Sequence, residues 1–177
     1  MRTKAAIHAR VEFIAWQLFD PFRAFCVFRG PTDFFSVKNQ GNIPIVVPEF
    51  IFVYGTLRKQ QASDMHHVLA KHCDYLSDGV MRGRLYEVCG YPGAIESGDE
   101  NDKVYGELYK MHDRKLVLAQ LDEYEECSDR FPMPHEYGRK QISIHLVGGG
   151  SVVAWVYLYN HDVSKLQQIL SGDYPGG

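Results

Sequence analysis

Four acidic residues lie within five positions near the end of a predicted helix: Asp122, Glu123, Glu125 and Glu126. The apolar residues of this helix that gather on one side are Val117, Leu118, Leu121 and Tyr124. Glu125 falls at the edge of that apolar stripe, whereas Glu123 faces away from it. A carboxylate at the edge of the core loses hydration, which raises its pKa toward the range of a general base. Helical spacing by itself favours the simpler interpretation, an acidic helix end that faces solvent.

A second candidate lies upstream, where the five apolar residues 50–54 run directly into Gly55 and Thr56. Apolar residues on both faces of so short a run predict a strand that is buried on both sides. Glycine then lets the backbone turn sharply and approach a ligand closely. The N–H groups of the loop after the strand are therefore candidates for binding an anion or a developing oxyanion.

Several motifs together resemble the γ-glutamylcyclotransferase-like superfamily, which includes AIG2-like and γ-glutamylamine cyclotransferase-like proteins. The matching motifs are Tyr-Gly-Thr-Leu-Arg at residues 54–58, Tyr-Pro-Gly-Ala at 91–94, Val-Tyr-Gly-Glu-Leu-Tyr at 104–109, Leu-Asp-x-Tyr-Glu at 121–125, Tyr-x-Arg at 137–139 and Ala-Trp-Val-Tyr-Leu-Tyr at 154–159. The resemblance covers about residues 50–174 and agrees in order, spacing and chemistry.

The resemblance implies roles for residues in both candidate segments. In the superfamily, the last Glu of Leu-Asp-x-x-Glu is the catalytic acid and base, which here is Glu125. The Tyr-Gly-Ser/Thr-Leu loop holds the γ-glutamyl group, and the corresponding residues are Tyr54, Gly55, Thr56 and Leu57. Tyr157 is a weaker candidate for substrate binding.

The reaction that the resemblance implies is an intramolecular aminolysis, in which the α-amine of a γ-glutamyl compound attacks its own γ-carbonyl. It releases 5-oxoproline and a free amine or amino acid, and it requires no metal or organic cofactor. Two alternatives stay open: a related acyl transfer from a γ-glutamyl amine or lysine side chain, and a catalytically silent binding module. Many members have glycine after the catalytic glutamate, whereas this chain has Glu126, so the local turn and the preferred substrate also stay open.

Composition permits such an enzyme. The chain has 177 residues, is 45% hydrophobic and carries a net charge of −3, which argues against nucleic acid as its main partner. No apolar run reaches the ~18 residues needed to span a bilayer. The four cysteines form no Cys-x-x-Cys pair and are too few to indicate a disulfide framework, so we expect a cytoplasmic protein. The sequence does not indicate an oligomeric state.

The chain changes character near residue 49. Residues 1–48 hold seven of the ten phenylalanines and have a net charge of +3, whereas the remainder holds all eleven tyrosines and has a net charge of −6. We therefore predict an N-terminal extension, residues 1–48, and one domain, residues 49–177. The extension is open to two interpretations: an amphipathic targeting or membrane-surface segment, or an upstream stretch that was wrongly taken as coding. We favour the second, because Glu12 separates the basic from the apolar residues and no serine precedes Ser36.

The domain is predicted to be α+β, with a small, mainly antiparallel, barrel-like sheet and flanking short helices, as in the γ-glutamylcyclotransferase-like fold. Besides the first strand, we expect strands near residues 81–88, 104–111, 141–147 and 151–159, the last two forming a hairpin around the glycines at 148–150. Helices are expected from Ser63 to about Lys71, from Asp113 to Glu126 and from Ser164 to Leu170. Residues 127–138, with two prolines, are expected to form a loop over the site.

A metal site is the weaker interpretation of the histidines at His66, His67 and His72 beside Cys73. Their separations of five and six residues do not place ligands on one helical face, and no second cluster completes a tetrahedron.

Removal of the residues before about residue 46 should leave both fold and activity intact, because the family motifs begin at residue 50. Thermal unfolding of the truncated protein, followed by circular dichroism, checks the fold. Loss of the cooperative transition would show instead that the phenylalanine-rich segment is part of the core.

Overall fold

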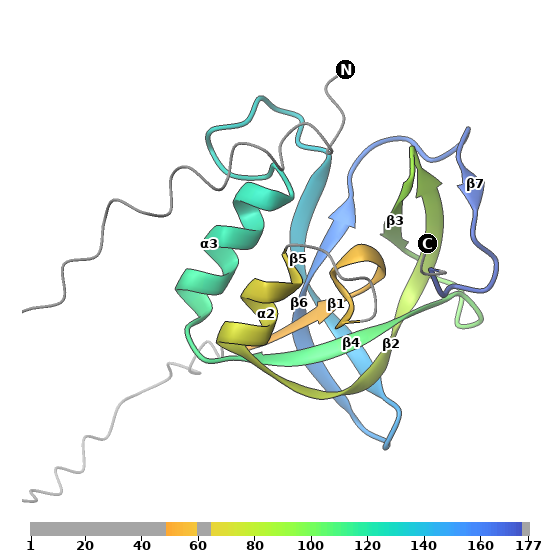
Figure 1. The fold of residues 1–177 in the computed structure, drawn as a ribbon. Coiled ribbons are helices and arrows are strands. Elements are labelled where there is room, and N and C mark those ends of the chain that lie inside the picture. Colours follow the sequence, from red (N-terminus) through yellow and green to blue (C-terminus); the bar gives the residue numbers. More distant parts are fainter. Residues whose placement is uncertain (1–48, 60–64, 175–177) are drawn as a thin grey trace, which may run out of the picture. The chain divides into compact units, whose positions relative to one another are not determined.

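Five strands close into a barrel in the computed structural model, which describes residues 49–59 and 65–174 (Figure 1). In order around the barrel they are β2 (Cys73–Val88), β4 (Lys103–Met111), β1 (Phe50–Val53), β6 (Ser151–Tyr159) and β5 (Tyr137–Leu146), which pairs back with β2. All of these pairings are antiparallel except that of β1 with β6. The predicted α+β fold with a mainly antiparallel, barrel-like sheet is confirmed.

Strand β2 is much longer than predicted. It has 16 residues, whereas the sequence indicated only residues 81–88. Its first part pairs with β4 and β5, and its last residues pair with β3 (Tyr91–Glu96) and with the short β7 (Gln167–Gln168). An irregularity in the register between Tyr75 and Ser77 breaks the alternation of buried and exposed side chains. That break removed the period-two signal from the first half of the strand.

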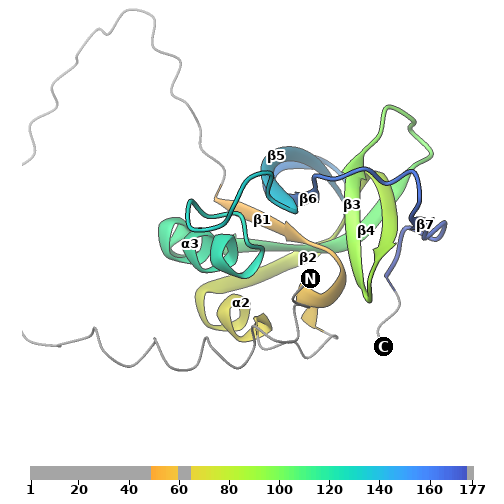
Figure 2. The same ribbon diagram turned by 90° about the horizontal axis from the view of Figure 1, so that it is seen from above.

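Two helices lie on the same side of the barrel, opposite β3 and β7 (Figures 1 and 2). They are α2 (His66–His72) and α3 (Arg114–Tyr124), and a single 3-10 turn, η2 (Gly55–Leu57), follows β1. Asp113 caps α3 as predicted, since its carboxylate accepts a hydrogen bond of 3.1 Å from the N–H of Leu116. The predicted start of α2 at Ser63 lies outside the described residues.

The helix predicted from Ser164 to Leu170 is wrong. Residues 167–168 instead form β7 at the edge of β2, and the N–H of Ile169 donates to the carbonyl of Leu85 at 2.8 Å. A helix of about two turns is marginal by itself, so the backbone hydrogen bonds that β2 offers determine the conformation. The predicted hairpin is confirmed, because β5 and β6 pair along their length around the three glycines.

The buried residues form two clusters, and β1 contributes to both. Ile51 and Val53 pack with residues of α2 and α3, among them Leu69, Val117 and Leu121. Phe52, on the opposite face of β1, packs inside the barrel with a separate set: Met81, Leu108, Ile144 and Val156. The prediction that the strand at residues 50–53 is buried on both sides is therefore confirmed.

Three cysteines in the described part of the chain, Cys73, Cys89 and Cys127, are free thiols. Among residues 49–59 and 65–174, no helix is both long and apolar enough to cross a membrane. The predicted domain boundary near residue 49 stays a prediction, since residues 1–48 are outside the described part.

Helix α3 ends two residues earlier than predicted, at Tyr124, and a tight reverse turn follows. The N–H of Cys127 donates to the carbonyl of Asp122 at 2.9 Å, and that of Glu126 donates to the carbonyl of Glu123 at 3.3 Å. This is the hydrogen-bond pattern of a Schellman motif, in which the residue at the Glu126 position adopts the left-handed conformation. Glu126 indeed has a φ of +55°, so the turn is kept although glutamate replaces the glycine expected from the family pattern.

Glu126→Gly should therefore stabilise the protein by about 1 kcal/mol, because glycine adopts a positive φ without the steric cost that a Cβ imposes. The expected result is a melting temperature about 4 °C higher. Differential scanning calorimetry checks it, and Glu123→Gly, in the last turn of the same helix, is the matched control. The control should lower the melting temperature, because its backbone is helical.

Candidate active site

Tyr54, at the end of β1, is fixed by hydrogen bonds to two other strands. Its hydroxyl donates to the carbonyl of Tyr157 on β6 at 2.6 Å and accepts from the N–H of Ala94 on β3 at 3.1 Å. The side chain is buried, so both bonds are shielded from water. Tyr54 is therefore a rigid attachment point from which the following loop starts.

Gly55 is required at the next position for two independent reasons. Its φ is +73°, and a Cβ there would lie 2.1 Å from Cγ of Pro92. Residues 91–94 lie in strand β3, and Pro92 packs against the loop from that strand. Leu57 is buried in the core beside the helices, whereas Thr56 is partly exposed. The segment 54–57 is thus a compact turn held from several sides.

Glu125 is buried, with 6% of the residue exposed, which agrees with its place at the edge of the apolar stripe and not with the solvent-facing helix end that spacing by itself favoured. It is the C-cap residue of α3, with φ −84° and ψ 5°, and its N–H donates to the carbonyl of Leu121 at 2.8 Å. Glu123 is 42% exposed and faces Arg130. The predicted contrast between an inward Glu125 and an outward Glu123 is confirmed. The Schellman turn after Glu125 fixes the direction in which its side chain leaves the helix.

The structure brings Glu125 and the loop together. Burial raises the pKa of the Tyr54 hydroxyl far above its usual value, and the nearby charge of Glu125 raises it further. The pKa of the Tyr137 hydroxyl is raised by burial, by Tyr54 and by Glu125. Tyr137, at the start of β5, donates to the carbonyl of Pro92 at 2.9 Å. One carboxylate, two protonated phenols and the turn at Gly55 therefore share a buried neighbourhood.

Asp122, which sequence reasoning did not single out, ties the end of α3 to the barrel. Its carboxylate accepts from Arg139 Nη1 at 2.6 and 2.7 Å and from the Tyr157 hydroxyl at 2.7 Å. The guanidinium of Arg139 also lies 5.0 Å from the centre of the Trp155 ring. Asp122 thus holds the helix end that carries Glu125, and the hydroxyl of Tyr157 points to Asp122. The substrate-binding role of Tyr157 stays a prediction.

Tyr137 and Arg139 are part of a family motif, but no role in the site was assigned to them from the sequence. Tyr137 and Arg139 are two positions apart, and side chains two positions apart on a strand point to the same face. The buried Tyr137 and the half-buried Arg139 do both lie near the end of α3. What the sequence could not show is which residues of α3 they would meet.

The histidines near residue 70 all lie on α2. The Nδ1 atom of His66 lies 3.4 Å from the carbonyl oxygen of Leu57. Within residues 49–59 and 65–174, no group of three or more His, Cys, Asp or Glu side chains is arranged to hold a metal ion.

Known proteins share both this sequence and this fold. The family model for γ-glutamyl cyclotransferase, AIG2-like, matches residues 51–176. The γ-glutamylcyclotransferase family protein YtfP of Escherichia coli K12 is 34% identical over 125 residues, which are 70% of this chain and 94% of that protein. γ-Glutamylaminecyclotransferase A of Danio rerio is 30% identical over 128 residues, 64% of this chain and 72% of that protein.

The fold is that of an AIG2-like protein from Mus musculus, with a TM-score of 0.56 and 24% identity over 72% of this chain and 88% of that one. The family match spans the strand β1, its loop, Glu125 and the barrel that holds them, which is the whole of the candidate site. On these grounds the chain belongs to the AIG2-like γ-glutamyl cyclotransferase family.

Proposed function

We propose that this protein is an enzyme that cyclises a γ-glutamyl compound, releasing 5-oxoproline and a free amine or amino acid. The observation that carries the proposal is the burial of Glu125 beside Tyr54, at the start of the loop 54–57. A buried carboxylate close to a loop that binds the substrate would be suited to take up and return protons. Family membership supports the substrate class.

The nucleophile and the electrophile of this reaction belong to one molecule, so the protein does not have to bring two reactants together. The protein has to hold the γ-glutamyl group in a folded conformation, so that the α-nitrogen meets the γ-carbonyl carbon. The rigid attachment of Tyr54 and the turn at Gly55 favour such positioning, since neither can move without breaking buried contacts. Backbone N–H groups of residues 55–57 would stabilise negative charge on the γ-oxygen.

Glu125 would serve as the proton carrier. It takes a proton from the α-ammonium group, and the resulting amine attacks the γ-carbonyl carbon to form the new C–N bond. Two protons leave the α-nitrogen in total, and two arrive on the departing nitrogen as the old C–N bond breaks. The carboxylate is therefore regenerated, and no oxidant, metal or organic cofactor enters the balance.

The leaving group is the open part of the proposal. The relative from Danio rerio is named for γ-glutamylamines, so the substrate panel should contain amines as well as amino acids. We expect 5-oxoproline from at least one compound in a panel of γ-glutamyl amino acids, γ-glutamyl alkylamines and γ-glutamyl-ε-lysine, measured by liquid chromatography. Transfer of the γ-glutamyl group to an added amine without 5-oxoproline would support the acyl-transfer alternative, and binding without release would support a silent module.

Glu125→Gln tests the proton carrier. The amide keeps the shape of the side chain but cannot accept a proton, so kcat should fall by about 10²–10⁴-fold, while KM changes little. Glu123→Gln and Glu126→Gln are matched controls on the same helix end and should retain kcat. Activity that persists in Glu125→Gln and disappears in Glu126→Gln would assign the role to the neighbouring residue, and full activity in all three would remove general-base catalysis from this helix.

A further inference from the structure

A second buried carboxylate contacts the residues that directly follow the loop. Glu107 on β4 is 1% exposed, and in the described part of the chain Glu125 is the other buried acidic residue. Glu107 pairs with Val53 of β1, the strand from which the loop starts. Burying a carboxylate costs free energy unless hydrogen bonds compensate the lost hydration. The hydrogen-bond partners of Glu107 therefore indicate what this residue does.

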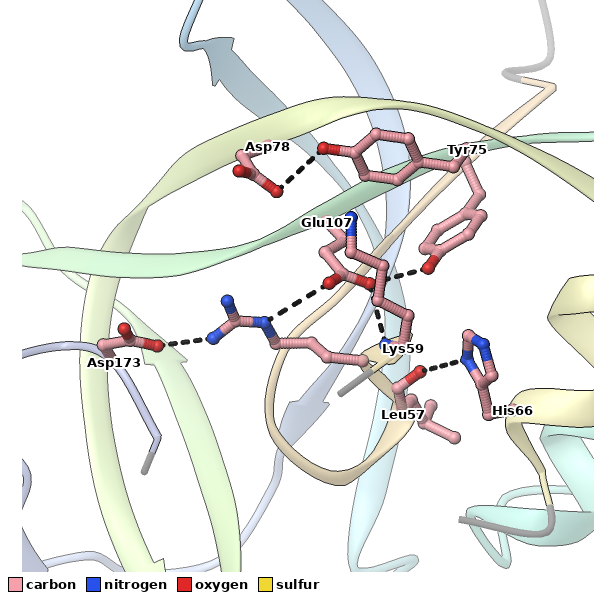
Figure 3. Close-up of polar contacts among 9 residues, drawn as sticks. Leu57, Lys59, His66, Tyr75, Asp78, Glu107 and Asp173 are labelled. Carbon is pink, nitrogen blue, oxygen red and sulfur yellow. Dashed lines mark hydrogen bonds and ion pairs between the residues drawn. The ribbon is translucent and has the colours of Figure 1, made fainter. Parts of the chain in front are cut away.

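Two of those partners, Arg58 and Lys59, directly follow the loop, and the third, Tyr109, lies on β4 itself. Figure 3 shows the contacts of Glu107 with these neighbours. Oε2 of Glu107 accepts from the backbone N–H of Lys59 at 3.0 Å and from the hydroxyl of Tyr109 at 2.6 Å. Oε1 lies 3.8 Å from Nε of Arg58. Burial raises the pKa of the Tyr109 hydroxyl and Glu107 raises it further, so this phenol remains a donor. Glu107 thus binds two consecutive residues directly after Leu57.

Arg58 extends this attachment to the C-terminal segment. Its guanidinium reaches both Glu107 and Asp173, with Nε at 3.8 Å from Oε1 of Glu107 and Nη1 at 2.5 Å from Oδ1 of Asp173. The segment around Asp173 is itself held by the barrel, since the N–H of Tyr105 donates to the carbonyl of Gly172 at 2.9 Å. The charge of Arg58 is therefore used within the protein, and its side chain secures the loop.

We propose that Glu107 is a positioning residue that holds the loop 54–57 in its substrate-binding conformation by accepting the hydrogen bond of the Lys59 N–H. Tyr54 fixes the start of the loop and Glu107 fixes its end, so the turn between them has little freedom to open. The effect on catalysis rests on the proposed function, whereas the effect on the loop does not.

Two conservative variants separate the effect of the length of the Glu107 side chain from the effect of its charge. Glu107→Gln retains the length of the side chain and an oxygen that can accept from Lys59 and Tyr109, but it loses the charge. Glu107→Asp retains the charge but is one methylene shorter, so the hydrogen bond to the Lys59 N–H is lost. We expect KM to rise about tenfold in Glu107→Asp and to stay within about threefold in Glu107→Gln. The fall in kcat should be smaller than the rise in KM, because Glu125 is unchanged.

Glu96 provides the matched control. It lies on β3, is 50% exposed and pairs with Lys140 at 2.8 Å. Glu96→Asp and Glu96→Gln should both keep the KM of the unsubstituted protein. A Glu107→Asp protein that melts at a lower temperature but has an unchanged KM would overturn the proposal, since Glu107 would then contribute to stability alone. A larger rise in KM for Glu107→Gln than for Glu107→Asp would overturn it too, because the charge of the side chain rather than its hydrogen bond to Lys59 would then hold the loop.

Hydrogen–deuterium exchange, without substrate, tests the loop independently of the reaction. The amides of residues 54–59 should exchange about tenfold faster in Glu107→Asp than in Glu107→Gln or the unsubstituted protein. Equal exchange in all three would overturn the proposal. If the unsubstituted protein forms no 5-oxoproline from any compound, the proposed function is wrong, and exchange alone then decides whether Glu107 holds the loop.

Discussion

The burial of β1 on both of its faces is the constraint on which the rest of the structure depends. This strand of four residues lies between β4 and β6, the latter in parallel, and its side chains alternate between the barrel interior and the helices. A strand in that position cannot shift by one residue without reversing both sets of side chains. Its end is therefore a fixed point, and the loop 54–57 begins there.

Two buried carboxylates lie near that loop, and their surroundings differ. Glu107 accepts hydrogen bonds from Lys59 and Tyr109 and lies near a guanidinium, which are the surroundings of a carboxylate that holds neighbouring segments in place. Glu125 instead lies among phenols that stay protonated, and its charge acts on Tyr54 and Tyr137. The same side-chain chemistry thus suits positioning in one place and proton transfer in the other.

The way in which α3 ends determines the direction of the Glu125 side chain. The Schellman turn reverses the chain directly after it, and the hydrogen bonds that Asp122 accepts from Arg139 and Tyr157 hold that helix end against β5 and β6. The backbone carbonyl of Tyr157 in turn accepts a hydrogen bond from the hydroxyl of Tyr54. The end of α3 and the start of the loop are therefore connected through one residue of β6, and a displacement of either would be felt by the other.

The sequence by itself determined the features that depend on local patterns: the doubly buried β1, the Asp113 cap and the β5–β6 hairpin. Helical spacing placed Glu125 at the edge of the apolar stripe, and the tertiary structure decided that it is buried. Prediction from the sequence failed where contacts with residues distant in the sequence decide the local conformation. Residues 167–168 became a strand because β2 offered free backbone groups, and β2 itself doubled in length across an irregular register. The roles of Asp122 and Glu107 were likewise hidden, because the groups that satisfy a buried carboxylate are assembled only when the barrel closes.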